Sequence, residues 1–180
     1  MTRPSPGGAV SVRPAAADDV EAMLDVLERV VDEGRWVGTE PPLDRVDRRD
    51  RFMAAIESEA AVHLVAVVDG QVVGELGMER APYGVAHLGM CVDPGWRGRG
   101  VGGALVAEAI AAAPRLGAHK LALQVWPHNS VARRLYRRYG FAEEGRIRRH
   151  YRRRNGELWD AVVMGLVIDQ ESPGSPYPDG

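Results

Sequence analysis

The spacing of apolar residues divides the chain into helices and strands. Apolar residues recur every three or four positions over 18–32 and 48–58, which predicts two amphipathic helices joined by a loop over 34–47. Between 62 and 92 the period changes to two, which is typical of strands. We expect strands over 62–68 and 72–78, joined at Asp69-Gly70-Gln71, and a third strand over 85–92.

The second half of the chain alternates in the same manner. A helix is expected over 100–113 before Pro114, and another over 129–139 between an Asn cap and Gly140. A strand over 119–125 separates them, and Asn155-Gly156 predicts a final hairpin of strands 146–154 and 157–168. With a short first strand over 9–13, the order is β-α-α-β-β-β-α-β-α-β-β. This order indicates an α/β (α+β) fold with a mixed, largely antiparallel sheet.

Composition narrows the class of protein. The chain has 180 residues, of which 45% are hydrophobic and 27% charged, as in one soluble globular domain. We expect this domain at 9–168, between disordered tails at 1–8 and 169–180 that are rich in Pro, Gly and Ser. The net charge of −2 gives no general attraction to nucleic acid or to a membrane.

Targeting and metal sites are not expected either. No apolar run reaches the ~18 residues of a spanning helix, and the first residues lack the apolar stretch of a signal peptide. The single cysteine, Cys91, excludes an internal disulfide and a multi-cysteine zinc site. None of the histidines lies in a cluster with metal-ligand spacing. We therefore expect a cytoplasmic protein without a metal.

The segment with the clearest chemistry lies between the strand over 85–92 and the helix after it. Its glycine-rich loop, RGRGVGG at 97–103, lets the backbone approach a ligand, and the first N–H groups of the helix favour a phosphate or pyrophosphate. A P-loop requires a Lys after its glycines, and no Lys follows them here. A dinucleotide-binding site is also disfavoured, because the segment follows hairpin strands. In addition, Glu108 is too close to the glycines to be the acidic residue that binds the ribose. A glycine-rich surface turn is the alternative interpretation.

Two motifs in this order resemble the GNAT superfamily of N-acetyltransferases. Val92-x-Pro94-x-x-Arg97-Gly98-x-Gly100-Val101-Gly102 resembles its coenzyme A signature, Gln/Arg-x-x-Gly-x-Gly/Ala. The segment NSVARRLYRRYGF at 129–141 resembles the family's Asn-x-x-Ala-x-x-Leu-Tyr-x-x-x-Gly-Phe. The resemblance covers about 9–168, and the segment from 136 to 165 is similar to bacterial members that acetylate amino acids or small amines. It implies a GNAT-like fold and an acetyltransferase that uses acetyl-CoA.

The resemblance also implies where coenzyme A binds. The pyrophosphate is expected on the loop, and the pantetheine arm beside the strand that ends at Val92, where the sheet opens toward the strand over 120–125. Asn129 is expected to contact the arm as well as to cap its helix; capping alone is the alternative. The implied binding residues are Met90, Cys91, Val92, Arg97, Gly98, Arg99, Gly100, Val101, Gly102, Gly103 and Asn129.

The implied reaction is direct attack of a neutral amine on the thioester. A backbone N–H near Cys91 or Val92 would stabilise the oxyanion, and Tyr136 would protonate the leaving thiolate. A buried core aromatic is the alternative role of Tyr136. The base candidates are Glu75, Glu79 and His87, each of which could instead be an ordinary strand residue. Cys91 is read as a small buried hydrophobe and not as a nucleophile.

The acceptor side is less defined by the sequence. The loop over 34–47 and the last hairpin are expected to line it, with Trp36, Glu40 and Trp159 as candidates. The arginines of that hairpin either bind an anionic acceptor or form a solvated edge. We expect a small-molecule primary amine, for instance an amino acid, as acceptor; a protein or peptide amine and a non-catalytic acyl-CoA sensor are the alternatives. A narrow pocket near Trp36 would favour a small-molecule acceptor, and an open groove would favour a protein or peptide. A homodimer is compatible with the family.

Overall fold

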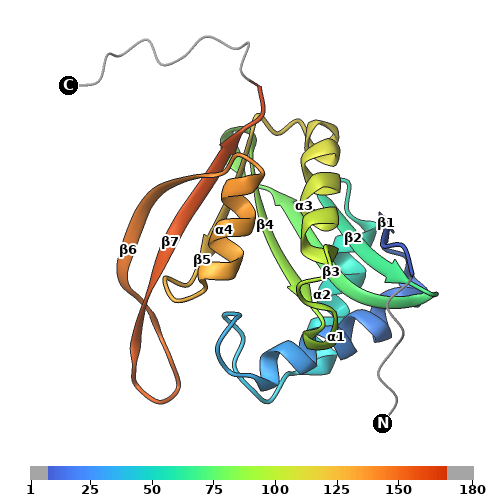
Figure 1. Ribbon diagram of the computed structural model, residues 1–180, viewed down its shortest axis with the longest axis horizontal. Helices are drawn as coiled ribbons and strands as arrows, with labels where there is room; N and C mark the ends of the chain where they lie inside the picture. The colour runs from blue at the N-terminus through green and yellow to red at the C-terminus, as the bar shows by residue number, and fades with distance from the viewer. Residues whose placement is uncertain (1–7, 170–180) are drawn as a thin grey trace.

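The computed structural model describes residues 8–169, which form a seven-stranded sheet with helices on both faces (Figure 1). The strand order across the sheet is β1-β2-β3-β4-β5-β7-β6. Neighbouring strands are antiparallel except β4 and β5, which are parallel. The strands are β1 (Ser11–Pro14), β2 (Ala61–Val68), β3 (Gln71–Arg80), β4 (Val85–Val92), β5 (Lys120–Val125), β6 (Ala142–Arg152) and β7 (Leu158–Val167).

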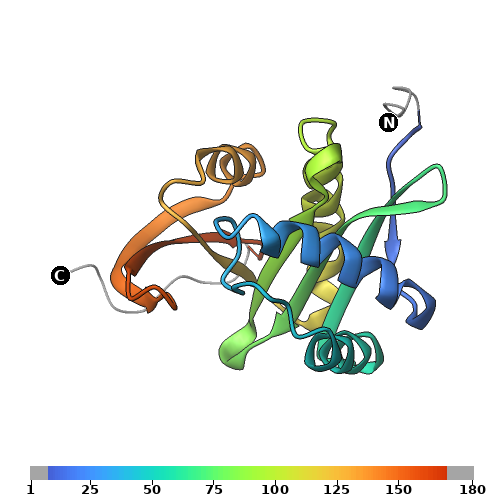
Figure 2. The same cartoon turned by 90° about the horizontal axis from the view of Figure 1, so that it is seen from below.

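Two pairs of helices cover the sheet, one pair on each face. Helices α1 (Val20–Asp32) and α2 (Arg45–Glu57) lie on one face, and α3 (Val101–Ala112) and α4 (Ser130–Arg138) lie on the other (Figure 2). The order of helices and strands is the one expected from the sequence, and the mixed, largely antiparallel sheet is confirmed.

Alternation of side chains along the strands builds a separate core on each face of the sheet. On β2, Leu64 and Ala66 pack beneath α3, whereas Val65 packs beneath α1 and α2. Phe52 of α2 completes the second core and is 5% exposed. The sheet therefore separates two hydrophobic cores, one on each face.

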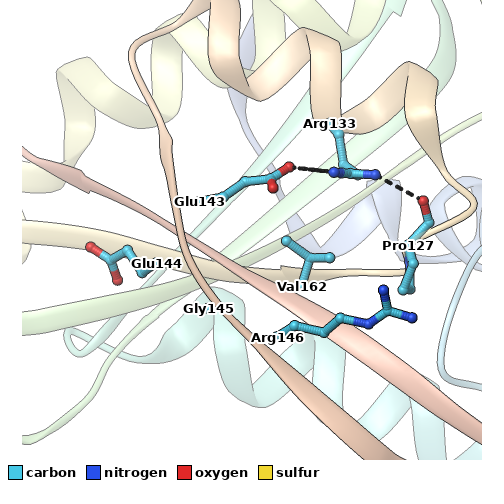
Figure 3. Close-up of a pocket in the computed structure, with 7 residues that line it drawn as sticks. All are labelled: Pro127, Arg133, Glu143, Glu144, Gly145, Arg146 and Val162. Carbon is cyan, nitrogen blue, oxygen red and sulfur yellow. Dashed lines mark hydrogen bonds and ion pairs between the residues drawn. The ribbon is translucent and has the colours of Figure 1, made fainter.

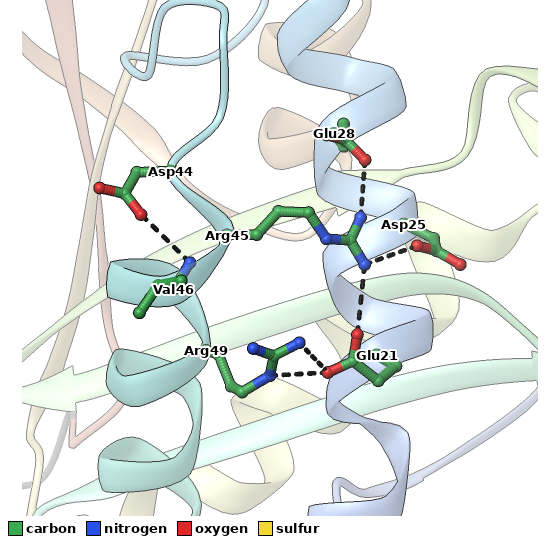
Figure 4. Close-up of polar contacts among 7 residues, drawn as sticks. All are labelled: Glu21, Asp25, Glu28, Asp44, Arg45, Val46 and Arg49. Atoms are coloured by element: carbon green, nitrogen blue, oxygen red, sulfur yellow. Dashed lines mark hydrogen bonds and ion pairs between the residues drawn. The ribbon is translucent and has the colours of Figure 1, made fainter.

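An acidic row on α1 sets the packing of α2 (Figure 4). Arg45 donates hydrogen bonds to Asp25 at 2.9 Å and to Glu28 at 2.6 Å, and Arg49 donates to Glu21 at 2.7 Å. These side chains are partly exposed, so each pair contributes at most about 1 kcal/mol. Together they hold α2 alongside α1 and leave the loop between them to cross the sheet.

Two expected boundaries differ from the structure by more than two residues. Helix α2 begins at residue 45 and not at 48, because Asp44 Oδ1 accepts hydrogen bonds from the N–H groups of Val46 and Asp47, each at 3.1 Å. Strand β6 begins at Ala142 and not at Arg146. It is an edge strand with almost all of its residues exposed, so no apolar alternation marks its first four residues.

The tails expected at 1–8 and 169–180 lie outside the described residues, apart from Gly8 and Asp169. Within residues 8–169, none of the helices combines the length and the apolar character needed to cross a bilayer.

Candidate active site

The sheet opens between β4 and β5, as the resemblance implied. These parallel strands pair only from Val85 to His87 on β4 and from Lys120 to Ala122 on β5. Beyond this point β5 pairs with β7 alone, and the two strands diverge (Figure 1). The second half of β4 therefore has an unpaired backbone edge inside the molecule, which can accept an extended ligand.

The register of β4 decides which backbone groups face this opening. The N–H of Asp93 donates to the carbonyl of Val73 on β3 at 3.0 Å. Because successive residues point their backbone groups to opposite sides, Cys91 turns its N–H and C=O toward β3, whereas Met90 and Val92 turn theirs toward the opening. The geometry therefore supports Met90 and Val92, but not Cys91, as residues whose backbone can contact a ligand there.

The glycine-rich loop presents free N–H groups at the start of α3. Gly98 and Gly100 have φ angles of +74° and +86°, and a Cβ on either would meet no atom within 4 Å. The first helical bond runs from the N–H of Ala104 to the carbonyl of Gly100 at 3.0 Å, so the N–H groups of residues 101–103 have no acceptor within the helix. This loop and helix end can hold a phosphate.

The other two glycines of the loop have a packing role. A Cβ on Gly102 would lie 3.0 Å from Leu135 Cδ2, and a Cβ on Gly103 would lie 2.8 Å from the hydroxyl of Tyr139. Both neighbours belong to the segment that forms α4 and its end. These glycines let α4 approach α3 closely, and this contact brings the face of α4 that carries Tyr136 against the sheet.

The two arginines of the loop differ in their surroundings. Arg97 forms an ion pair with Glu33, at 2.9 Å to both carboxylate oxygens. Arg99 is exposed and lies 4.9 Å from the ring centre of Trp96, without an acidic partner in the described part of the chain. Arg99 is thus the arginine whose charge is available to an incoming phosphate.

Helix α4 supplies two of the expected residues. Asn129 Oδ1 accepts a hydrogen bond from the N–H of Ala132 at 3.1 Å, so the expected cap is confirmed. Tyr136 is 6% exposed and packs against Phe141 at 5.5 Å between ring centres. Burial, followed by the neighbouring Cys91, raises the pKa of Tyr136, so its phenol keeps the proton at neutral pH. Within residues 8–169, its hydroxyl makes no hydrogen bond.

Glu75 lies on the opposite face of the sheet in a buried polar cluster. His63 Nε2 lies 2.8 Å from Glu75 Oε2, and both residues are more than nine-tenths buried. Burial, and then the Glu75 carboxylate, raise the pKa of the Cys91 thiol well above its usual range, which agrees with an inert cysteine. The sequence pattern did not single out His63; its signal was a histidine inside an apolar strand.

His87 differs from Glu75 in its exposure. It is exposed on β4 and lies opposite Glu79 in the register with β3. It shares the α1–α2 face with Glu75 and Cys91, because residues two apart on a strand point to the same side. The structure therefore places one buried and one exposed base candidate on the face from which an acceptor could approach.

A row of rings links the loop between α1 and α2 to the last hairpin. Trp36, in the loop between α1 and α2, lies 5.9 Å from His128, which lies 5.3 Å from Trp159 of β7. Trp126 packs edge-on against Trp159 at 5.3 Å. His128 Nε2 is also 3.0 Å from the carbonyl of Arg35. The loop therefore contacts both the start of α4 and the last hairpin.

A buried arginine ties the same loop to the turn of that hairpin. Arg153 is 5% exposed, lies 4.5 Å from the ring centre of Trp159 and donates to the carbonyl of Gly38 at 2.9 Å. The carboxylate of Glu40 accepts from the N–H of Arg154 at 3.0 Å. The interpretation of the hairpin arginines as a solvated edge therefore does not hold for Arg153, because this side chain is buried and joins two segments that are distant in the sequence.

A separate cavity of about 380 Å³ lies between the start of α4 and strands β6 and β7 (Figure 3). Arg133 in its wall donates to Glu143 at 2.8 Å and to the carbonyl of Pro127 at 3.0 Å. Arg146 donates to Asp160 at 2.7 Å. Both arginines in its wall are therefore already paired with a carboxylate of the described chain.

The residues present fit coenzyme A. The open cradle at Gly98 and Gly100 and the free helix N–H groups suit its pyrophosphate, and the unpaired edge at Met90 and Val92 suits its amide-containing arm. Tyr136, with its proton retained and its hydroxyl without a protein partner, is placed by α4 on the donor face. The arrangement can bind a thioester on one face and admit an amine from the other.

Comparison with known proteins agrees with this arrangement. A protein of Escherichia coli (strain K12) named L-amino acid N-acetyltransferase AaaT is 40% identical over 110 residues, which cover 58% of this chain and 67% of that protein. A ribosomal-protein-alanine N-acetyltransferase from Brucella melitensis superposes with a TM-score of 0.80 at 25% identity, over 87% of this chain and 99% of that one. Proteins named for different acceptors are thus similar to this chain.

A further solved structure contains the cosubstrate. A GNAT superfamily phosphinothricin acetyltransferase from Sinorhizobium meliloti in complex with acetyl-CoA superposes with a TM-score of 0.79, at 21% identity, over 94% of this chain and 96% of that one. Residues 24–141 match the family described as the acetyltransferase (GNAT) family. This match covers more than half of the chain, so the protein belongs to the acetyltransferase (GNAT) family, and acetyl-CoA is its cosubstrate.

Proposed function

We propose that the protein transfers the acetyl group of acetyl-CoA to the primary amine of a small molecule such as an amino acid. The observation that carries this proposal is the contact between the loop after α1 and the last hairpin. Trp36, His128 and Trp159 form a continuous row, and Arg153 and Glu40 fasten the loop to the hairpin turn. An extended peptide needs an open groove between this loop and the hairpin. A small amine needs less space and can bind where the loop and the hairpin are in contact.

Each residue then has a physical role in the transfer. Acetyl-CoA supplies the electrophilic thioester carbonyl. The N–H of Met90 donates to the developing oxyanion, while Val92 pairs with the pantetheine arm. Tyr136 gives its proton to the sulfur as the C–S bond breaks. Asn129 has its Oδ1 engaged in the cap, so its amide nitrogen is the group that contacts the arm.

The amine proton needs an acceptor on the opposite face. An amine of pKa ~8–10 is mostly protonated at pH 7 and must lose a proton before it attacks. His87, exposed on β4, can accept it directly; Glu75, hydrogen-bonded to His63, can accept it through water. The neutral amine then attacks the thioester carbon, and its nitrogen loses a second proton once the N–C bond has formed. This second proton balances the one that Tyr136 gives to the sulfur, so the products are the amide and the free thiol.

The test is thiol release from acetyl-CoA with free amino acids, polyamines, aminoglycosides and pentapeptides as acceptors. Calorimetry on the same preparation measures acetyl-CoA binding. We expect turnover with a small amine and none with the pentapeptides. Turnover of pentapeptides as fast as that of any small amine contradicts the proposal. Binding of acetyl-CoA without turnover of any acceptor contradicts it too, and favours a sensor.

A further inference from the structure

Two buried polar atoms lack a hydrogen-bond partner within residues 8–169: Arg48 Nε and His63 Nδ1. Buried polar groups are nearly always paired, so each exception requires a physical explanation. Both side chains pack around Phe52, Arg48 at 6.0 Å and His63 at 5.1 Å from the centre of its ring. His63 stands on β2, two strands away from the opening of the sheet. Arg48 differs from His63 because its side chain also contacts Thr39 in the loop between α1 and α2.

Arg48 also differs from every other arginine of α2. Arg45 and Arg49 pair with the acidic row of α1 (Figure 4), and Arg51 pairs with Asp47 at 2.9 Å. Within the described chain, Arg48 has no carboxylate partner; its one hydrogen bond donates to Thr39 Oγ1 at 3.1 Å. A partly buried guanidinium without a counter-charge is unfavourable. An anionic group bound beside it would remove that cost.

The position of Arg48 relates it to the reaction. Arg48 packs against Phe52, whose ring lies 5.1 Å from that of His63; His63 Nε2 lies 2.8 Å from Glu75, which is paired with Cys91 of β4. Cys91 is the neighbour of Met90, whose N–H faces the opening. Arg48 therefore reaches from α2, beneath the loop at Thr39, toward the acceptor face of β4.

Space for a ligand exists on the same face. Gly89 shares the face of Cys91, is exposed, and would have no atom within 4 Å of an added Cβ. Its partner across the register with β3 is Gly77, where an added Cβ would lie 3.1 Å from Cε1 of the His63 ring. A small acceptor can therefore lie over Gly89 beside the His63 ring, with one end toward Met90 and the other toward Arg48.

We propose that Arg48 binds the carboxylate of the acceptor, which makes the acceptor a free α-amino acid and not a polyamine or an aminoglycoside. The inference rests on the proposed acetylation of a small amine and specifies its substrate. Arg48 Nε and a terminal nitrogen form the planar fork that pairs with two carboxylate oxygens. In an α-amino acid the amine and the carboxylate share one carbon, so an anchored carboxylate holds the amine at a short, fixed distance from Arg48.

The test removes the carboxylate from the substrate and the guanidinium from the enzyme separately. The acceptors are L-leucine, L-leucinamide and 3-methylbutylamine, and the same series based on L-phenylalanine. The variants are Arg48→Gln and, as the matched control on the same helix, Arg51→Gln, which loses only the surface pair with Asp47. Thermal unfolding and acetyl-CoA binding establish that each variant is folded. Binding of N-acetyl-L-leucine and of its methyl ester is followed by NMR, which needs no turnover.

We expect Arg48→Gln to lower kcat/KM for the free amino acids about 10- to 100-fold, the range for a charge-assisted hydrogen bond. Activity on the amides and amines should stay within twofold, and Arg51→Gln should change neither. N-acetyl-L-leucine should bind the wild type more tightly than its ester, and this preference should vanish in Arg48→Gln.

Three results overturn the inference. An equal loss on acids, amides and amines assigns Arg48 a structural role. Equal use of all three acceptors by the wild type shows that no carboxylate is recognised. Turnover restricted to polyamines or aminoglycosides removes the amino-acid acceptor while the proposed acetylation of small amines stands. If the wild type binds acetyl-CoA and acetylates no amine, the proposed function fails together with this inference.

Discussion

Replacement of Tyr136 by Phe tests the proton donor with the least disturbance of the fold. The substitution removes one oxygen atom from a side chain that is 6% exposed. No hydrogen bond of the described residues is lost, because the Tyr136 hydroxyl makes none. The packing of the ring against Phe141 is retained. We therefore expect the stability of the protein and its affinity for acetyl-CoA to stay near those of the wild type.

The loss should instead appear in turnover. A general acid contributes about 10²–10⁴ in rate, which corresponds to about 2.7–5.4 kcal/mol of transition-state stabilisation. We expect kcat of Tyr136→Phe to fall within this range, measured as thiol release at saturating acetyl-CoA and acceptor. Tyr139→Phe is the matched control, since Tyr139 lies one turn later and its hydroxyl contacts α3 near Gly103. Its kcat should remain near that of the wild type.

The pH dependence gives an independent check of the same assignment. Burial raises the pKa of Tyr136, and the acid works only while it holds its proton. The wild type should therefore keep its activity beyond the ordinary tyrosine range near pH ~10, up to the pH at which the protein unfolds. A Tyr136→Phe enzyme with kcat within twofold of the wild type would refute the assignment. An equal loss in Tyr139→Phe would indicate a packing effect in place of proton donation.

Three further predictions concern the elements that support the site. Asp44→Ala removes both hydrogen bonds of the α2 cap and should lower the free energy of unfolding by about 1 kcal/mol, measured by urea titration, with acetyl-CoA binding unchanged; an unchanged midpoint contradicts the role of the cap. Gly100→Ala places a side chain at φ +86°, which should cost about 1–2 kcal/mol and weaken acetyl-CoA binding in calorimetry; unchanged affinity argues against this loop as the phosphate site. The hydrogen-bonded ion pair with Arg13 lowers the pKa of Asp19, so this pair stabilises the fold above pH ~4 and is lost as the pH falls below that value. Asp19→Asn should therefore flatten the loss of stability between pH 5 and 2 in thermal scans, and an unchanged acid limb would count against it.

The order of the helices and strands could be predicted because each element carries its own periodic pattern. The strand over 85–92 coincides with β4, since its apolar and polar residues alternate and turn residues flank it. Boundaries were less predictable where the signal was not apolar. The cap at Asp44 and the exposed edge strand β6 depend on hydrogen bonds to segments that the local pattern does not reveal.

The glycine-rich loop shows how far a motif can be interpreted. All its glycines appeared to serve the ligand, but only Gly98 and Gly100 have positive φ angles and open surroundings. Gly102 and Gly103 are required by the close approach of α4, which lies about 30 residues later in the chain. A contact between distant helices cannot be read from the spacing of glycines within one of them.

The sequence by itself determined the element order, the position of the glycine-rich loop before α3 and the cap of α4, because these depend on residues close together in the chain. Tertiary structure alone decided which side of β4 each backbone group faces, the pairing of His63 with Glu75, and the burial of Arg153 against a loop more than one hundred residues earlier. It also left Arg48 without a counter-charge on the acceptor face. The physical reason is that burial and charge compensation depend on which segments meet in space, and sheet register and helix packing determine this over the whole chain.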